Sequence, residues 1–231
     1  MTSYPADSRL YVALDLPTIE AAEAMIEKLG DHVLSYKIGL QLLPIGGVAL
    51  GQRLKKLGKN VFYDFKFHDI DATVEKATRS VAGLGADLLT VHARPDVMRA
   101  AVKGRGESQL KLLGVTVLTS LDKKALEDIG YSMSAEDLVM RRVEQAILAG
   151  MDGVVSSPLE AGAIRSIVSD DFLIVTPGVR MPGGDKGDQK RVATPKDAFQ
   201  SGASHLVIGR PITAQNDPAR ATQDILANIQ S

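Results

Sequence analysis

Eight short apolar segments alternate along the chain with longer segments whose apolar residues recur at three- and four-residue spacing. The alternation predicts strands followed by amphipathic helices. The expected strands are Leu10–Leu16, Leu34–Ile38, Asn60–Phe67, Leu88–Val91, Leu112–Leu118, Gly153–Ser156, Phe172–Thr176 and His205–Ile208. Among the helices, one is expected from Ile19 to Leu29, and another follows Ser134, whose hydroxyl suits an N-cap. Several helices should end at glycines, such as Gly30 and Gly150.

Strands that are apolar almost throughout are typical of a parallel sheet covered by helices. Eight strand–helix units in 231 residues favour a closed (β/α)8 TIM barrel over an open doubly wound sheet. No stretch resembles an interdomain linker, so we expect residues 1–231 to form a single α/β barrel domain. In such barrels the loops that follow the strands build the active site, and those after strands seven and eight often hold phosphate.

Composition narrows the class of protein. A net charge of −1 provides no broad basic field, which argues against a nucleic-acid partner. The absence of cysteine excludes disulfides and thiolate metal sites. No apolar stretch approaches the roughly 18 residues that a membrane span needs, and residues 1–9 lack a signal-peptide core. We therefore expect a cytoplasmic enzyme or binding protein with no membrane partner.

Charged residues stand at the ends of three adjacent strands. Asp15 follows the first strand, Lys37 ends the second, and the third contains Asp64 and Lys66. Because side chains alternate along a strand, Asp64 and Lys66 should share one face, roughly 7 Å apart. Buried charges are costly unless they pair, so a purely structural network is one interpretation. The position at strand ends favours the other, an active site in which lysine supplies the positive charge in place of a metal ion.

The end of the eighth strand carries Gly209-Arg210, which combines backbone N–H groups and a guanidinium suited to a phosphate. Arg180 and Gln189 lie in the Gly- and Pro-rich segment after strand seven. That segment is either a loop that closes over a ligand or a solvated surface loop. Hydroxyls at a strand end, such as those of Thr119 and Ser120, often act as caps.

The segment Asp64-Phe65-Lys66-Phe67-His68-Asp69 resembles the Asp-x-Lys-x-x-Asp motif of the orotidine monophosphate decarboxylase suprafamily. Six further elements resemble the bacterial decarboxylases in the same order, so the likeness runs from about residue 10 to about residue 220. They are Asp15, Lys37-Ile38-Gly39, residues 117–120, residues 176–180, residues 187–191 and residues 207–211. One departure stands out: the family commonly has Ile-Pro-Asn-Thr where this chain has Ile70-Asp71-Ala72-Thr73.

The resemblance implies a lyase that needs no cofactor or metal and converts orotidine 5′-monophosphate to uridine 5′-monophosphate and carbon dioxide in de novo pyrimidine biosynthesis. Lys66 would protonate C6 of the pyrimidine, and Asp64 would hold Lys66 beside the substrate carboxylate. Lys37 would pair with Asp64 and contact the ribose. Lys37, Asp64, Lys66 and Asp69 would together form an alternating charged catalytic array. Asp69 would reach the site of the neighbouring subunit, which implies a homodimer.

The same resemblance assigns the remaining substrate contacts. Asp15 and Asp69 of the partner subunit would bind the ribose hydroxyls, with Thr73 completing that segment. Thr119 and Ser120 would meet the pyrimidine. Arg180, Gln189, Gly209 and Arg210 would surround the phosphate. His68 and His92 receive no catalytic role.

Two other functions remain open on the sequence. A magnesium-dependent decarboxylase of a keto-sugar phosphate would keep Asp64, Lys66 and Asp69, but it requires an acidic metal ligand after strand two, where this chain has Lys37. The other is a noncatalytic protein that binds nucleotide phosphates, for which the charged residues Lys37, Asp64, Lys66 and Asp69 would be superfluous.

Overall fold

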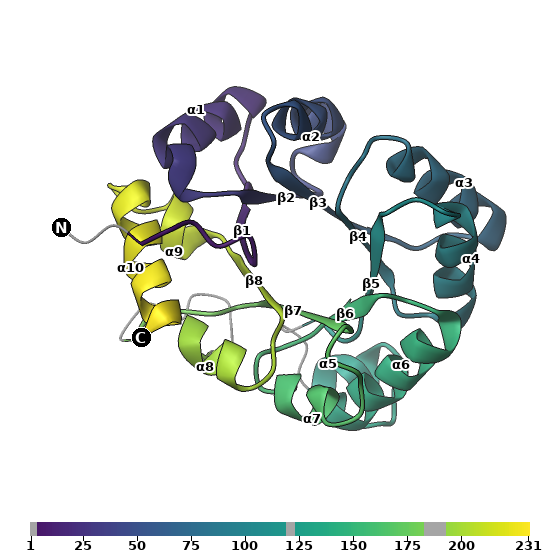
Figure 1. The fold of residues 1–231 in the computed structure, drawn as a ribbon. Helices are drawn as coiled ribbons and strands as arrows, with labels where there is room; N and C mark the ends of the chain where they lie inside the picture. Colours follow the sequence, from purple (N-terminus) through teal and green to yellow (C-terminus); the bar gives the residue numbers. More distant parts are fainter. Residues whose placement is uncertain (1–3, 119–122, 183–192) are drawn as a thin grey trace.

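A computed structural model of the chain describes residues 4–118, 123–182 and 193–231, and its eight parallel strands close into a barrel surrounded by helices (Figure 1). The predicted (β/α)8 fold is confirmed. Each strand pairs with the next in the chain, and β8 closes the barrel on β1, with Val207 opposite Tyr11. The strands are β1 (Leu10–Ala13), β2 (Ser35–Gly39), β3 (Asn60–Phe67), β4 (Leu88–His92), β5 (Lys111–Val115), β6 (Gly153–Val155), β7 (Leu173–Pro177) and β8 (His205–Ile208).

The helices form the outer ring in Figure 1. They are α1 (Ile19–Leu29), α2 (Gly47–Lys56), α3 (Asp71–Ala82), α4 (Pro95–Arg105), α5 (Lys123–Asp128), α6 (Ala135–Ala149), α7 (Ala161–Arg165), α8 (Pro195–Gln200), α9 (Arg210–Thr213) and α10 (Pro218–Gln230), with short 3-10 turns η1 (Gly30–His32) and η2 (Leu43–Ile45). The predicted cap of α6 is confirmed, since the Ser134 side chain accepts a hydrogen bond from the Asp137 N–H. Gly30 and Gly150 end α1 and α6 with positive φ, as expected.

Two predicted strands extend three residues too far at their C-terminal ends, and the predicted Gly153–Ser156 ends one residue beyond β6. β1 ends at Ala13 rather than Leu16, and β5 ends at Val115 rather than Leu118. Leu14 lies beyond β1 yet is completely buried. Apolar character there reflects packing against the core rather than pairing in the sheet. The shorter strands leave Asp15 on a loop at the C-terminal mouth of the barrel.

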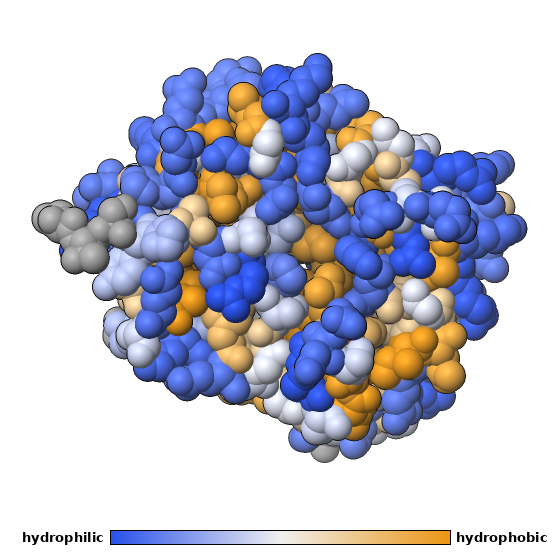
Figure 2. Space-filling view, in the orientation of Figure 1, coloured by the Kyte–Doolittle hydropathy of each residue, from blue (hydrophilic) through white to orange (hydrophobic). Residues whose placement is uncertain are grey.

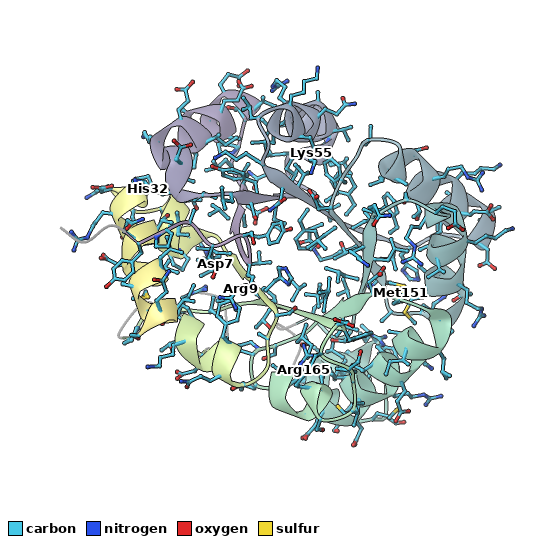
Figure 3. All side chains as sticks on the ribbon, in the orientation of Figure 1. Asp7, Arg9, His32, Lys55, Met151 and Arg165 are labelled. Atoms are coloured by element: carbon cyan, nitrogen blue, oxygen red, sulfur yellow. The ribbon has the colours of Figure 1, made fainter. Side chains whose placement is uncertain are left out.

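The opposite end of the barrel is held by polar side chains that precede β4, β6 and β8. Each accepts the backbone N–H of a residue in the preceding strand, which ties neighbouring strands together where they begin. The bonds are Val61 N to Asp87 Oδ2 (2.7 Å), Leu112 N to Asp152 Oδ2 (2.9 Å) and Ile174 N to Ser204 Oγ (2.8 Å). Lys55 also pairs with Asp87 at 2.7 Å, and Arg9 pairs with Asp7 beside β1 at 2.7 Å (Figure 3). In this fold that end contributes stability rather than chemistry.

The apolar interior of the barrel is separate from the larger core between sheet and helices. Tyr11, Phe62, Leu88, Leu113 and Val175 fill the interior, where the rings of Tyr11 and Phe62 meet edge to face at 5.7 Å. The visible surface is mostly hydrophilic with scattered hydrophobic patches (Figure 2). Within the described residues, no helix combines the length and hydropathy required to span a bilayer.

Candidate active site

Four charged residues meet at the C-terminal ends of β1, β2 and β3. Lys37 Nζ donates to both carboxylate oxygens of Asp15, at 2.9 and 3.0 Å, and lies 3.6 Å from Asp64 Oδ2. Lys66 Nζ donates to the same Asp64 oxygen at 2.8 Å. Asp15, Lys37, Asp64 and Lys66 therefore form a row of alternating sign, hereafter the charged row.

Asp64 is the centre of the charged row. Its side chain is 15 % exposed, and that of Lys37 is 8 % exposed. Burial by itself would raise the pKa of Asp64, but the charges of Lys37 and Lys66, together with hydrogen bonds from Lys66 and Thr90, hold that pKa below its ordinary value. The carboxylate thus stays ionised between two ammonium groups.

β3 is not a regular strand throughout, although the prediction that Asp64 and Lys66 share a face assumed regular alternation of its side chains. Its register with β4 shifts between Tyr63 and Phe67, and Lys66 has a φ of 50°, which is unusual for a residue other than glycine. The side chains of Asp64 and Lys66 nevertheless meet and line one cavity. The expectation that they share a face is confirmed, whereas the assumption of a regular strand is wrong because this part of β3 is a bulge.

Thr90 on β4 contacts both residues at the bulge. Its hydroxyl donates to Asp64 Oδ1 at 2.9 Å and accepts the backbone N–H of Lys66 at 3.0 Å. Thr90 is not among the predicted site residues. The signal for it is a polar residue within the apolar run Leu88–Val91, two positions after the interior-facing Leu88.

Gly39 at the end of β2 leaves room for the Asp15–Lys37 pair of the charged row. A Cβ atom at this position would lie 2.9 Å from Asp15 Oδ1 and 3.1 Å from Lys37 Nζ. Any larger residue would therefore push the Asp15–Lys37 pair apart. This contact gives a physical reason for the glycine in the element Lys37-Ile38-Gly39.

Two adjoining cavities flank the charged row. The first, the polar cavity, has a volume of about 340 Å³ and is lined by Asp15, Lys37, Asp64, Arg180, Gly209 and Arg210, among others. The second, the apolar cavity, has a volume of about 160 Å³, and its walls include Phe62, Lys66, Val115, Val117, Leu118 and Val155. Asp64, Pro177 and Val207 line both cavities, so the charged row lies at their junction.

The other predicted residues are placed differently. Asp69 is exposed, its Oδ1 accepts the N–H of Ile70 at 2.7 Å, and no ion pair among the described residues joins it to Lys37 or Lys66. Thr73 is exposed in the first turn of α3. That helix begins at Asp71, where a carboxylate favours a helix N-terminus, so the turn forms without the proline of the family pattern. Thr119, Ser120 and Gln189 lie outside the described residues.

His68 and His92 lie beside the charged row rather than in it. The rings of His68 and His92 are 5.1 Å apart, and His68 Nε2 lies 3.1 Å from Arg94 Nη1. Burial, followed by the nearby charges of His68 and Arg142, lowers the pKa of His92. In the parts of the chain that the structure describes, no three histidine, aspartate or glutamate side chains are grouped as metal ligands.

Comparison with known proteins agrees with the geometry. The family model "Orotidine 5′-phosphate decarboxylase / HUMPS family" matches residues 8–225. A relative from Caulobacter sp. (strain K31), named orotidine 5′-phosphate decarboxylase, is 58% identical over 224 residues, which cover 97% of this chain and 98% of the relative. One of the same name from Caulobacter vibrioides is 56% identical over 228 residues, with the same coverage. The crystal structure of orotidine 5′-phosphate decarboxylase from Lactobacillus acidophilus superposes with a TM-score of 0.84 at 34% identity, covering 99% of this chain and 100% of the other.

Proposed function

Since the chain belongs to the orotidine 5′-phosphate decarboxylase / HUMPS family, we propose that it converts orotidine 5′-monophosphate to uridine 5′-monophosphate and carbon dioxide. It is a carboxy-lyase like the relatives that match it along nearly their whole length. One observation carries the proposal: the ionised Asp64 lies between two lysine ammonium groups at the junction of a polar and an apolar cavity.

The two cavities suit the two ends of the nucleotide. Arg180, Arg210 and the backbone of Gly209 line the polar cavity, where guanidinium groups would bind the phosphate. Asp15 and Lys37, the first two members of the charged row, line the same cavity and would contact the ribose hydroxyls. The aliphatic walls around Val115 and Val155 would enclose the pyrimidine. A nucleotide lying this way brings its C6 carboxylate to Asp64 and Lys66.

Lys66 would supply the proton that completes the reaction. When the bond between C6 and the carboxyl carbon breaks, carbon dioxide departs and the electron pair stays on C6 in the plane of the ring. The ring π system cannot delocalise that pair, so a fixed positive charge must stabilise it. The ammonium of Lys66 lines the apolar cavity, and transfer of its proton to C6 would give the product. Solvent then returns a proton to the lysine.

Asp64 would act before the bond breaks. Its ionised carboxylate lines both cavities and would face the carboxylate of the bound substrate. Repulsion between the two charges disappears as neutral carbon dioxide forms, so it favours the forward step. Asp64 also holds Lys66 at 2.8 Å, which keeps the ammonium in place without reorganisation.

The remaining assignments complete the site in a homodimer. Asp69 and Thr73, exposed and apart from the charged row of their own chain, would contact the ribose in the neighbouring subunit. Ser120 and Thr119 would meet the pyrimidine, and Gln189 the phosphate. We propose that the enzyme acts in the cytoplasm, in de novo pyrimidine biosynthesis, with a single barrel domain and no cofactor.

The proposal is tested with metal-stripped protein and orotidine 5′-monophosphate, following the loss of substrate absorbance. We expect turnover that neither magnesium nor a chelator changes, and its loss in the Lys66→Ala variant. Strict dependence on magnesium would favour a decarboxylase of keto-sugar phosphates instead, although Lys37 occupies the place of the metal ligand which that reaction needs. Nucleotide binding without turnover would indicate a noncatalytic binding protein.

A further inference from the structure

Thr90 occupies a special place opposite the bulge in β3. Tyr63 pairs with Leu89 and Phe67 pairs with Val91, so three residues of β3 face one residue of β4 between these pairs. The three are Asp64, Phe65 and Lys66, and the one is Thr90. A bulge leaves ladder groups without their usual partners, and these must be satisfied in another way.

The Thr90 hydroxyl provides a partner for one of these groups, the backbone N–H of Lys66. It accepts the Lys66 N–H at 3.0 Å and donates its own proton to Asp64 Oδ1 at 2.9 Å. A hydroxyl has one donor and two acceptor positions, so a single group makes both bonds. Thr90 is completely buried, and its branched Cβ restricts χ1, which leaves the hydroxyl little freedom to turn away.

Both contacts bear on the charged row. Lys66 adopts a φ of 50°, a conformation that a lysine keeps only when its surroundings impose it. The bond from Lys66 N to Thr90 holds the backbone there, and the bond to Asp64 leaves Oδ2 facing Lys66 Nζ and Lys37 Nζ. We propose that Thr90 is a positioning residue that holds the Lys66 backbone and the Asp64 carboxylate in the geometry that decarboxylation requires. This inference rests on the proposed roles of Lys66 and Asp64.

The test compares Thr90→Val, which keeps the shape and removes the hydroxyl, with Thr90→Ser, which keeps the hydroxyl. Because a small misplacement of reacting groups can cost two orders of magnitude, we expect kcat of Thr90→Val to fall about 10²-fold. KM for orotidine 5′-monophosphate should change less than about threefold, since Arg180, Gly209 and Arg210, which would bind the phosphate, keep their places in the polar cavity. The acid limb of the kcat–pH profile should move to higher pH, because Asp64 loses a hydrogen bond that lowers its pKa. Thr90→Ser should restore most of kcat.

Thr78→Val provides a matched control. Thr78 on α3 is also completely buried, but its hydroxyl has no hydrogen-bond partner among the described residues. The same substitution there should leave kcat, KM and the pH profile unchanged. If Thr90→Val does not fold, Thr90→Ala replaces it in the comparison with Thr90→Ser.

The outcomes separate this inference from the function on which it rests. Wild-type kcat and pH profile in the hydroxyl-free Thr90 variant, with Lys66→Ala inactive, would overturn the role of Thr90 alone. Full turnover by Lys66→Ala would instead refute the proposed proton donor. If Thr90→Val raised KM and left kcat unchanged, so that the whole loss in kcat/KM came from weaker binding, a positioning role would also be contradicted.

Discussion

Replacing Asp64 with asparagine removes the charge between Lys37 and Lys66 while keeping the shape of the side chain. The carboxylate attracts Lys66 at 2.8 Å by about 6 kcal/mol and Lys37 at 3.6 Å by about 5 kcal/mol, at an effective dielectric constant of 20. Burial of the carboxylate offsets much of this attraction. Removal of one partner from a buried pair typically costs about 3–5 kcal/mol, because the other charge stays behind uncompensated. If about 4 kcal/mol of this cost raises the activation free energy of decarboxylation, kcat falls about 10³-fold.

The assay measures kcat and KM by substrate absorbance, with the melting temperature recorded on the same preparation. Asp87→Asn is the matched control, since Asp87 pairs with Lys55 at 2.7 Å at the opposite end of the barrel. That variant should lower the melting temperature and leave kcat within about twofold of wild type. A kcat for Asp64→Asn within a few-fold of wild type, alongside an inactive Lys66→Ala, would refute the electrostatic reasoning.

Three further outcomes are expected. Arg210→Ala should raise KM about 10²-fold and leave the melting temperature nearly unchanged, because the charged hydrogen bond proposed between Arg210 and the phosphate would be lost. An unchanged KM would indicate that the phosphate binds elsewhere. Gly39→Ala should displace the half-exposed Asp15 from Lys37. We expect KM to rise about tenfold and the free energy of unfolding to change by less than about 1 kcal/mol. A large loss of stability with an unchanged KM would contradict this reasoning. Burial lowers the pKa of His205 to about 4, so between pH of about 6.5 and 4 the unfolded state binds a proton that the native state does not. Stability should fall as pH falls through that window, and His205→Gln should lessen the fall.

Much of the fold follows from local patterns. All eight strands lie within two or three residues of their predicted positions, and α6 begins after its predicted cap Ser134. Hydrophobic periodicity and capping are properties of neighbouring residues, so the chain displays them before it folds. The predicted C-terminal ends of β1 and β5 lie three residues beyond the observed ones, because an apolar run does not distinguish a paired strand from a buried loop.

For the candidate site, the order of residues is enough to predict that Asp15, Lys37, Asp64 and Lys66 stand at the ends of adjacent strands. The way in which their side chains meet depends on contacts between strands. The bulge in β3, the positive φ of Lys66 and the double hydrogen bond of Thr90 arise from the register between β3 and β4. The close approach of Gly39 to Asp15 likewise brings the end of β2 against the loop that follows β1. These contacts link residues more than twenty positions apart, and their geometry depends on how strands pair, which no local pattern records.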